Sequence, residues 1–487
     1  MANTIKDENS VDQTKRYADR LLFSQLIAEN RNHFGNFAEI KFAPVDFHTN
    51  DTAFEELTQV GYNPDLGVLE AVIQIKQPYG YLGDHRTPGS YEYIRFYVDT
   101  GNGFEHAGLV AVNVHDLPHG TDRTRQATMP LSYAASVPYT PPNCEDCDNP
   151  SLPHVRAILS WQAIPSDPMF PVSWGNALEC RTSLKSGPTT VLDAIVNLFE
   201  DNALAGEATE GEAAASATPI PASATATLTL AERAKLYRGT VPTHRFAYED
   251  VHDALLDPTV DGKWVAAKMA EFAALKIDWA NTVGALTEQD ADATFEQLDS
   301  VALEARPGCE QLVATLRIKQ SAGYSGNLAT AGSFEYVAFW ADWDNMSTFA
   351  YLGTVPVKVH DINRASGEDL CYTVALPVDL SAHSTGRETA KIARIRAVLS
   401  WAVSPSTTNP NAMNSWGNSI DALVRFPVGK TGSSGGNMPR SSSLTEMFPG
   451  SAQVIAATPV ERPARKIENV PSRPPVPRPI AFMASTC

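Results

Sequence analysis

The chain has 487 residues and carries 38 basic against 56 acidic side chains, a formal net charge of −18. This acidic balance argues against a nucleic-acid binder or a binder of anionic membranes, because both need a cationic surface. The six cysteines are too few for a disulfide-built scaffold, and no apolar run reaches the roughly 18 residues of a membrane span. We therefore expect two or three folded domains, with no membrane span and no nucleic-acid partner.

Residues 1–45 are predicted to form an N-terminal helical segment. Ser10 and Gln13 have the spacing of a capping box, an apolar stripe begins at Tyr17, and Gly35 would end the helix. The acidic start around Asp7 does not match the basic and then apolar stretch of a cleavable signal peptide. Location therefore stays open between the cytoplasm and export by a signal-independent route.

An internal repeat indicates that the chain contains two copies of one structural unit. Four sequence blocks recur in the same order at a spacing of 240–245 residues: Gly-Tyr-x-Gly at 80–83 and 323–326, Val-His-Asp at 114–116 and 359–361, Arg-Ala-Ile/Val-Leu-Ser-Trp at 156–161 and 396–401, and Trp-Gly-Asn at 174–176 and 416–418. So many ordered matches cannot be chance, and they place the two copies at 46–185 and 289–428.

Within a copy the pattern is that of short β-strands. Val155, Ala157, Leu159 and Trp161 alternate with other residues and share one face of a strand. In the first copy, runs bounded by turn residues predict strands at 69–76, 91–98, 108–115, 155–161 and 174–181, with a hairpin turn at 99–103. We predict a mainly β chain of two tandem, homologous antiparallel β-sandwiches of immunoglobulin-like type, with a jelly roll as the alternative.

The remaining segments are helical or have linker composition. The stretch 186–229 is an Ala/Thr/Pro-rich linker, and 230–288 is a helical segment with helices expected at 230–237, 247–255 and 262–275. Residues 429–487 are a tail rich in glycine and serine and then in proline.

The end of this tail has a charge opposite to that of the body. From residue 452 onward there are five basic and two acidic residues, a net charge of +3 that leaves −21 on the rest of the chain. Its polyproline stretch is followed by apolar residues 480–484, which suit addition to an exposed sheet edge. We expect this tail to contact a neighbouring subunit through Arg473, Pro474, Pro475, Pro477, Arg478, Ile480, Phe482 and Met483.

The repeated Val-His-Asp block is the main candidate for chemistry. His115 with Asp116, and His360 with Asp361, have the residue types of a metal-ligand pair or a histidine–carboxylate dyad. Adjacent strand residues point to opposite faces, however, which favours a strand-end histidine followed by a turn aspartate.

Cys144 and Cys147 have the spacing of half a zinc site without a second half. We therefore predict no enzyme activity and no cofactor, and keep a metal-dependent enzyme based on the Val-His-Asp block as the least favoured alternative.

Aromatic side chains offer a second alternative function. Tyr81, Tyr324 and Trp343 are candidates for stacking on a glycan or peptide ligand. The even spacing of Tyr91, Tyr93 and other rings within the strands is more typical of core packing or subunit contact.

Taken together, the four repeated blocks resemble a family of uncharacterised bacterial proteins with repeated β-sandwich units. The resemblance covers both copies and the helical stretch 240–285. It implies a bacterial origin and a repeated non-catalytic module, and it assigns no site because no activity comes with it. The sequence thus predicts a structural homo-oligomer that self-associates, as a filament or lattice, with a carbohydrate- or peptide-binding module as the alternative.

Overall fold

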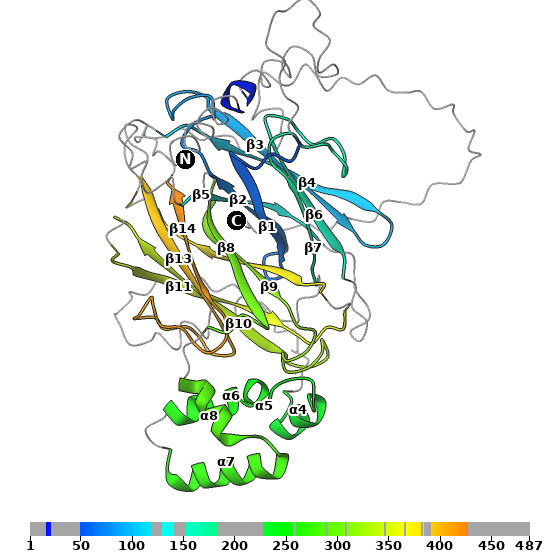
Figure 1. The fold of residues 1–487 in the computed structure, drawn as a ribbon, viewed down its shortest axis with the longest axis vertical. Helices are drawn as coiled ribbons and strands as arrows, with labels where there is room; N and C mark the ends of the chain where they lie inside the picture. Colours follow the sequence, from blue (N-terminus) through cyan, green and yellow to red (C-terminus); the bar gives the residue numbers. More distant parts are fainter. Residues whose placement is uncertain are drawn as a thin grey trace, which may run out of the picture. The chain divides into compact units, whose positions relative to one another are not determined.

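The computed structural model describes residues 16–20, 49–117, 129–140, 152–183, 227–256, 260–287, 291–306, 309–344, 347–364, 367–380, 383 and 391–426. All of them belong to one compact unit of the chain, Met1–Gly429. This described part is mainly β, as predicted, and the helices, which lie between the two groups of strands in sequence, gather at one end of the view (Figure 1).

Seven strands precede the helices, and we call them the first strand set. They are β1 (Glu55–Asn63), β2 (Val68–Ile75), β3 (Ser90–Asp99), β4 (Phe104–Val114), β5 (Leu131–Pro138), β6 (His154–Trp161) and β7 (Ala177–Arg181). Antiparallel pairing joins them in the orders β1–β2–β5 and β4–β3–β6–β7.

The second strand set follows the helices and repeats this pairing. It comprises β8 (Glu296–Arg306), β9 (Cys309–Ile318), β10 (Ser333–Asp342), β11 (Ala350–Val359), β12 (Leu370–Pro377), β13 (Ile392–Trp401) and β14 (Ser419–Arg425). The orders are β8–β9–β12 and β11–β10–β13–β14. Register shifts also recur, after Phe96 in β3 and after Phe339 in β10.

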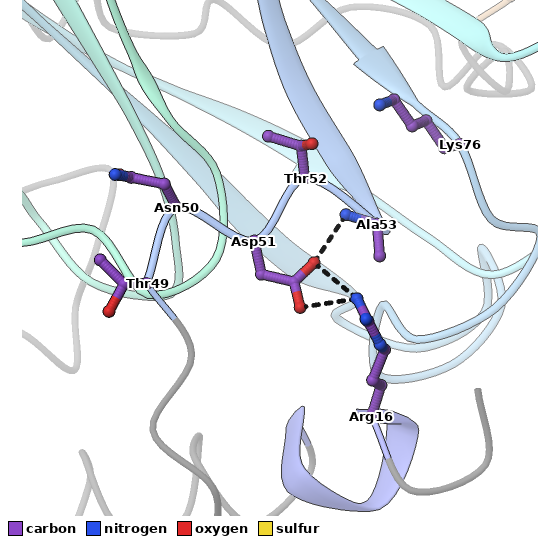
Figure 2. Close-up of a pocket in the computed structure, with 7 residues that line it drawn as sticks. All are labelled: Arg16, Thr49, Asn50, Asp51, Thr52, Ala53 and Lys76. Atoms are coloured by element: carbon purple, nitrogen blue, oxygen red, sulfur yellow. Dashed lines mark hydrogen bonds and ion pairs between the residues drawn. The ribbon is translucent and has the colours of Figure 1, made fainter. Parts of the chain in front are cut away.

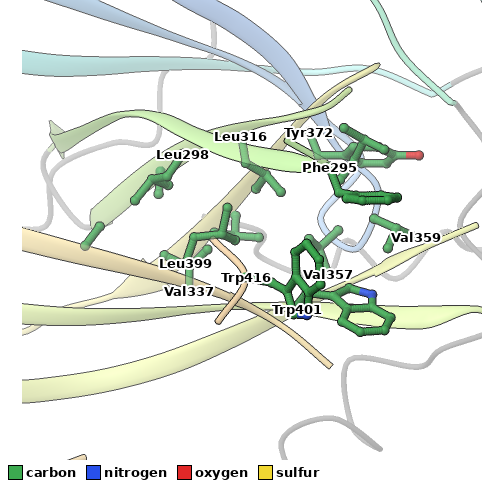
Figure 3. Packing of buried hydrophobic residues seen from close by; sticks show 14 of the residues in the cluster. Phe295, Leu298, Leu316, Val337, Val357, Val359, Tyr372, Leu399, Trp401 and Trp416 are labelled. Atoms are coloured by element: carbon green, nitrogen blue, oxygen red, sulfur yellow. The ribbon is translucent and has the colours of Figure 1, made fainter. Parts of the chain in front are cut away.

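Each set encloses its own apolar core. In β3, Ile94, Phe96 and Val98 point into the first core, where they meet side chains of β1, β2, β5 and β6. Figure 3 shows the second core, where Leu298 and Leu316 face Val337 and Leu399 from the opposite group of strands. Apolar side chains between two groups of strands fit a β-sandwich, and each fully buried one contributes about 1.5–3 kcal/mol.

The described part of the chain forms five helices between the two strand sets in sequence, and two of them begin at a polar side-chain cap. They are α4 (Leu230–Leu236), α5 (Thr243–Phe246), α6 (Glu249–Leu256), α7 (Gly262–Leu275) and α8 (Trp279–Thr287). Thr229 forms a capping box with Glu232 at the start of α4, and the Asp261 side chain caps α7. Together they bury Tyr237, Phe246 and Phe272 against the second core. None of the described helices has the length and apolar character to cross a membrane.

The two sets contact each other through reciprocal bridges. Strands β1, β5 and β7 of the first set correspond to β8, β12 and β14 of the second. β1 pairs with β12 at Tyr62 and Tyr372, and β8 pairs with β5 at Leu303 and Tyr133. In the same way β7 pairs with β12, and β14 pairs with β5. Because each type of contact occurs in both directions, the sets are related to each other approximately as the subunits of a two-fold dimer would be.

The expected strands 69–76, 91–98, 108–115 and 155–161 agree with β2, β3, β4 and β6 to within a few residues. The expected run 174–181 starts too early, because β7 begins at residue 177. The expected helices at 230–237, 247–255 and 262–275 correspond to α4, α6 and α7. Strands β1 and β5 and helices α5 and α8 were not expected.

The even-spaced rings of β3 do not pack in the main core, which was one of the two roles expected for them. Ile94 and Phe96 fill the first core, whereas Tyr97 lies in a small outer cluster with Ile158 and Val172. Tyr91 and Tyr93 share this outer face and stay partly exposed. The tail and most of the linker and of the N-terminal helical segment lie outside the described residues.

Candidate functional site

A fully buried arginine occupies the core of the first strand set. Arg20 comes from the short helical stretch 16–20, and its side chain is completely shielded from solvent. Its Nη1 donates to Glu55 Oε1 over 2.7 Å, its Nη2 lies 2.7 Å from Glu55 Oε2, and its Nε donates to the Gly80 carbonyl over 3.0 Å. A second buried carboxylate, Glu92, approaches Nη2 to 3.6 Å. Of the two contacts with Glu55, the one from Nη1 is a hydrogen bond, and the one from Nη2 is an ion pair without hydrogen-bond geometry.

Four aromatic rings enclose the same guanidinium. The arginine carbon Cζ lies 3.9 Å from the ring centre of Trp161 and 4.5 Å from that of Phe54. Tyr81 and Trp174 follow at 5.1 and 5.5 Å. Electron-rich ring faces attract a cation, with a strength that reaches about 2 kcal/mol per ring when water is excluded. We call this set of one arginine, two carboxylates and four rings an arginine cage.

An equivalent arginine cage lies in the second strand set. Arg245 of α5 donates to both oxygens of Glu296, at 2.8 and 2.7 Å, and Glu335 is the second buried carboxylate. The enclosing rings, from nearest to farthest, are Trp401 at 3.6 Å, Phe295 at 4.5 Å, Trp416 at 4.7 Å and Tyr324 at 5.5 Å. Figure 3 shows Phe295, Trp401 and Trp416 gathered at one end of the core.

Each cage holds two carboxylates against one guanidinium. Glu92 and Glu335 are fully buried, and their carboxylate oxygens accept no hydrogen bond. Burial raises the pKa of Glu92 well above its usual value, and the charge of Glu55 raises it further, while Arg20 lowers it less. The pKa of Glu335 is raised by burial and Glu296 in the same way. Burial raises the pKa of Glu55 and Glu296 as well, although the neighbouring arginine opposes this. Each cage therefore sets two buried carboxyl groups with raised pKa values against a single positive charge.

The repeated Gly-Tyr-x-Gly and Val-His-Asp blocks build the loop that closes each cage. Asp116 accepts hydrogen bonds from the backbone N–H groups of Tyr81 and Gly83, at 2.8 and 3.1 Å. Gly80 has a φ of +108°, and a Cβ there would lie 2.7 Å from the Phe54 ring. Glycine at this position therefore lets the Gly80 carbonyl reach Arg20.

In the second set the same loop is held by Asp361, which accepts from the N–H groups of Tyr324 and Gly326 at 2.8 and 3.1 Å. The hydroxyl of Tyr237 also donates to Asp361, over 2.6 Å. The aspartates of the Val-His-Asp blocks thus bind backbone groups in both sets.

The other two repeated blocks supply the indole rings. The strands β6 and β13 end at Trp161 and Trp401, and the Trp-Gly-Asn blocks contribute Trp174 and Trp416. In the first set, Asn176 holds the Trp-Gly-Asn block against β1, because its side chain accepts a hydrogen bond from Leu57 N over 2.7 Å and donates one to Leu57 O over 3.0 Å. All four repeated blocks therefore meet at the arginine cage.

The histidines of the Val-His-Asp blocks do not join these aspartates in a common site. His115 Nε2 lies 3.2 Å from the Thr87 carbonyl, and His360 Nδ1 lies 3.1 Å from the Asn327 carbonyl. Within the described residues no group of three potential metal ligands gathers anywhere. Cys144 and Cys147 lie outside those residues, as do the tail residues predicted to contact a neighbour.

The candidate stacking residues are engaged within the chain itself. Tyr81 and Tyr324 are completely buried and face the caged arginines, so neither offers a face to a ligand, contrary to the sequence-based expectation. Trp343 stacks on His383, with ring centres 3.7 Å apart. Burial of the first two rings follows from their loop, whose backbone is tied down by Asp116 and Asp361.

A crevice beside the first cage is lined by Arg16, Thr49, Asn50, Asp51, Thr52, Ala53 and Lys76 (Figure 2). Arg16 Nη1 lies 3.0 Å from Asp51 Oδ2, and Ala53 N donates to Asp51 Oδ1 over 2.8 Å. This ion pair attaches the helical stretch 16–20 to the chain segment that enters β1, and so supports the placement of Arg20.

Sequence reasoning missed both caged arginines. Arg20 and Arg245 are 225 residues apart, whereas the repeated blocks are 240–245 apart, so neither arginine falls within the matched pattern. The detectable signal was the pair Glu55 and Glu296, acidic residues at the same place in both copies within an otherwise buried strand.

No family model matches the chain, and no curated protein matches it either. Among solved structures it is similar to a transglutaminase from red sea bream, at 7% identity and a TM-score of 0.13, over 76% of this chain and 31% of that one. It is also similar to CBD12 from CALX1.2, at 8% identity and a TM-score of 0.14, over 76% of this chain and 99% of that one. A calcium-binding mutant of Bacteroides uniformis β-glucuronidase 2 is similar at 9% identity and a TM-score of 0.15, over 81% of this chain and 31% of that one. The chain thus spans about a third of the transglutaminase and of the glucuronidase, and likenesses this weak carry no argument.

Proposed function

We propose that this chain is a non-catalytic structural protein that self-associates, with its basic C-terminal tail contacting a neighbouring subunit. The observation that carries the proposal is the closed state of both arginine cages. A catalytic carboxylate must reach its substrate, but Glu55, Glu92, Glu296 and Glu335 are each 0% exposed. The four repeated blocks serve these internal contacts, so the repeated sequence maintains two rigid bodies.

We further propose that the two strand sets are tandem copies of one immunoglobulin-like β-sandwich. The pairing orders of the two sets correspond strand by strand, with three strands in one layer and four in the other. A tandem of rigid sandwiches that meet through buried contacts is suited to act as a spacer between binding surfaces. Glu304 of β8 supports such a link, because it accepts a hydrogen bond from Ser136 of the first set and is held in place by Gln311 of its own set.

Mass photometry of the full-length chain beside a 1–451 truncation tests the proposal. We expect oligomers of the full-length chain and a shift toward monomers in the truncation. A full-length variant with Arg473→Ala and Arg478→Ala keeps the chain length and removes only charge from the tail, so it should shift toward monomers in the same direction as the truncation. Monomers of the unaltered full-length chain would contradict self-association.

A further inference from the structure

The outer strands β4 and β11 occupy equivalent positions in the two strand sets, but their sequences differ in a way that affects pairing. Among the described strands, β4 hydrogen-bonds only to β3, and β11 only to β10, so each ends its layer (Figure 1). Beyond the register shift, β4 reads Leu-Val-Ala-Val-Asn-Val over 109–114, and β11 reads Thr-Val-Pro-Val-Lys-Val over 354–359. Ala111 therefore corresponds to Pro356, and Asn113 to Lys358.

Proline and lysine are residues that proteins place on sheet edges to prevent further pairing. Pro356 pairs with Tyr336, and the ladder continues on both sides of it, so its nitrogen, which has no hydrogen, faces the open side of β11. The edge of the second set is thus blocked at its centre. In the first set Ala111 has an N–H group at the same place, and no described strand pairs with this side of β4.

The apolar side chains beneath the two edges are covered to different extents. Val357 and Val359 of β11 are 1% exposed in the second core. The corresponding residues of β4 are Val112, which packs on the first core but stays partly exposed, and Val114, which is buried. A strand added to β4 would cover the partly exposed apolar side chains as well as pair the open backbone groups.

We propose that the edge of β4 pairs in antiparallel fashion with β4 of a second copy of this chain. The two-fold axis passes through Ala111, which makes the sequence self-complementary. Ala111 then faces its own counterpart, Leu109 faces Asn113, and Val110 faces Val112, so no charge opposes a like charge. The inference rests on the proposed self-association and assigns it one surface.

Exchanging the edge residues between the two sets tests this surface. Ala111→Pro with Asn113→Lys gives β4 the residues that β11 already tolerates, so the fold should survive. We expect the dimer dissociation constant, from sedimentation velocity of the full-length chain, to rise by more than about tenfold, which is 1.4 kcal/mol. The matched control, Pro356→Ala with Lys358→Asn, changes the other edge and should leave the β4 dimer intact.

A second measurement guards against misfolding of the proline variant. The variant Ala111→Cys should form a disulfide between the introduced thiols of two copies under oxidising conditions, because hydrogen-bonded antiparallel partners have Cα atoms about 5.5 Å apart. Peptide mapping identifies this link. Absence of the link, or association that is unchanged in the edge variant, overturns the inference. The 1–451 truncation keeps β4, so a truncation that loses larger oligomers but remains a dimer supports both proposals. A truncation that is only monomeric makes the tail the contact, which overturns the inference and leaves the proposed function standing; a monomeric wild-type chain overturns both.

Discussion

Replacing Arg245 by methionine removes the positive charge from the second arginine cage and leaves two carboxyl groups buried. Glu296 loses hydrogen bonds at 2.8 and 2.7 Å, and four rings lose the cation they enclose. Removing one partner of a buried ion pair costs about 3–5 kcal/mol, because the remaining charge stays desolvated. We expect the free energy of unfolding of the second strand set to fall by that amount.

Urea unfolding followed by tryptophan fluorescence measures this loss, since Trp401 and Trp416 lie in the cage. Adding Glu296→Leu and Glu335→Leu to the methionine variant should restore most of the stability, because an apolar core replaces the uncompensated carboxyl groups. Lys268→Ala is the control: its ion pair with Glu271 is partly exposed and contributes less than about 1 kcal/mol. If the methionine variant loses no more stability than this control, the buried charge does not stabilise the fold as we expect.

Two further predictions concern the same strand set. Glu335→Gln removes a carboxyl group whose pKa is raised by burial and by the charge of Glu296. The folded wild-type chain keeps a proton that the unfolded chain releases above about pH 4, so its stability should fall as the pH rises through the raised pKa. The thermal midpoint of the Glu335→Gln variant should therefore fall less with rising pH than that of the wild-type chain. The same pH dependence in both proteins would argue against a proton on Glu335. Gly417→Ala should cost about 3 kcal/mol or more, because φ is +109° and a Cβ would clash with the backbone carbonyl oxygen of Leu399. Gly284→Ala in α8 has open space and should instead stabilise by about 0.5–1 kcal/mol; equal effects of the two changes in calorimetry would disprove this account.

Strands with local alternation could be predicted from the sequence, and strands defined by distant partners could not. β6 was evident because Val155, Ala157 and Trp161 alternate on one face and are fully buried. β1 was missed because Glu55 and Gln59 read as solvent-exposed. Their partners, Arg20 and Asp299, lie 35 residues before Glu55 and 240 residues after Gln59, beyond the reach of a local pattern.

The candidate site was likewise predicted only in part. The four repeated blocks were identified, and they line the arginine cages or hold the loops that close them. Val-His-Asp was kept only as the least favoured candidate for chemistry and Tyr81 and Tyr324 as an alternative for stacking, and no block was expected to enclose a charge. The arginines themselves come from helical stretches whose distances to the strands differ between copies. Comparison of the copies therefore revealed the enclosing residues and not the group they enclose.

The caged arginines lie outside the repeated sequence, so the segment that is repeated is shorter than the segment that each strand set needs to fold. Arg20 precedes Glu55 by 35 residues and Arg245 precedes Glu296 by 51, so each counter-ion is encoded upstream of the strands that need it. A gene fragment cut at residue 46 or 289 would encode every strand of a set and still leave its carboxylates without a cation. Hybrid proteins made by exchanging these halves should therefore be joined within the linker, ahead of Arg245, and should keep Arg20 with the first strand set.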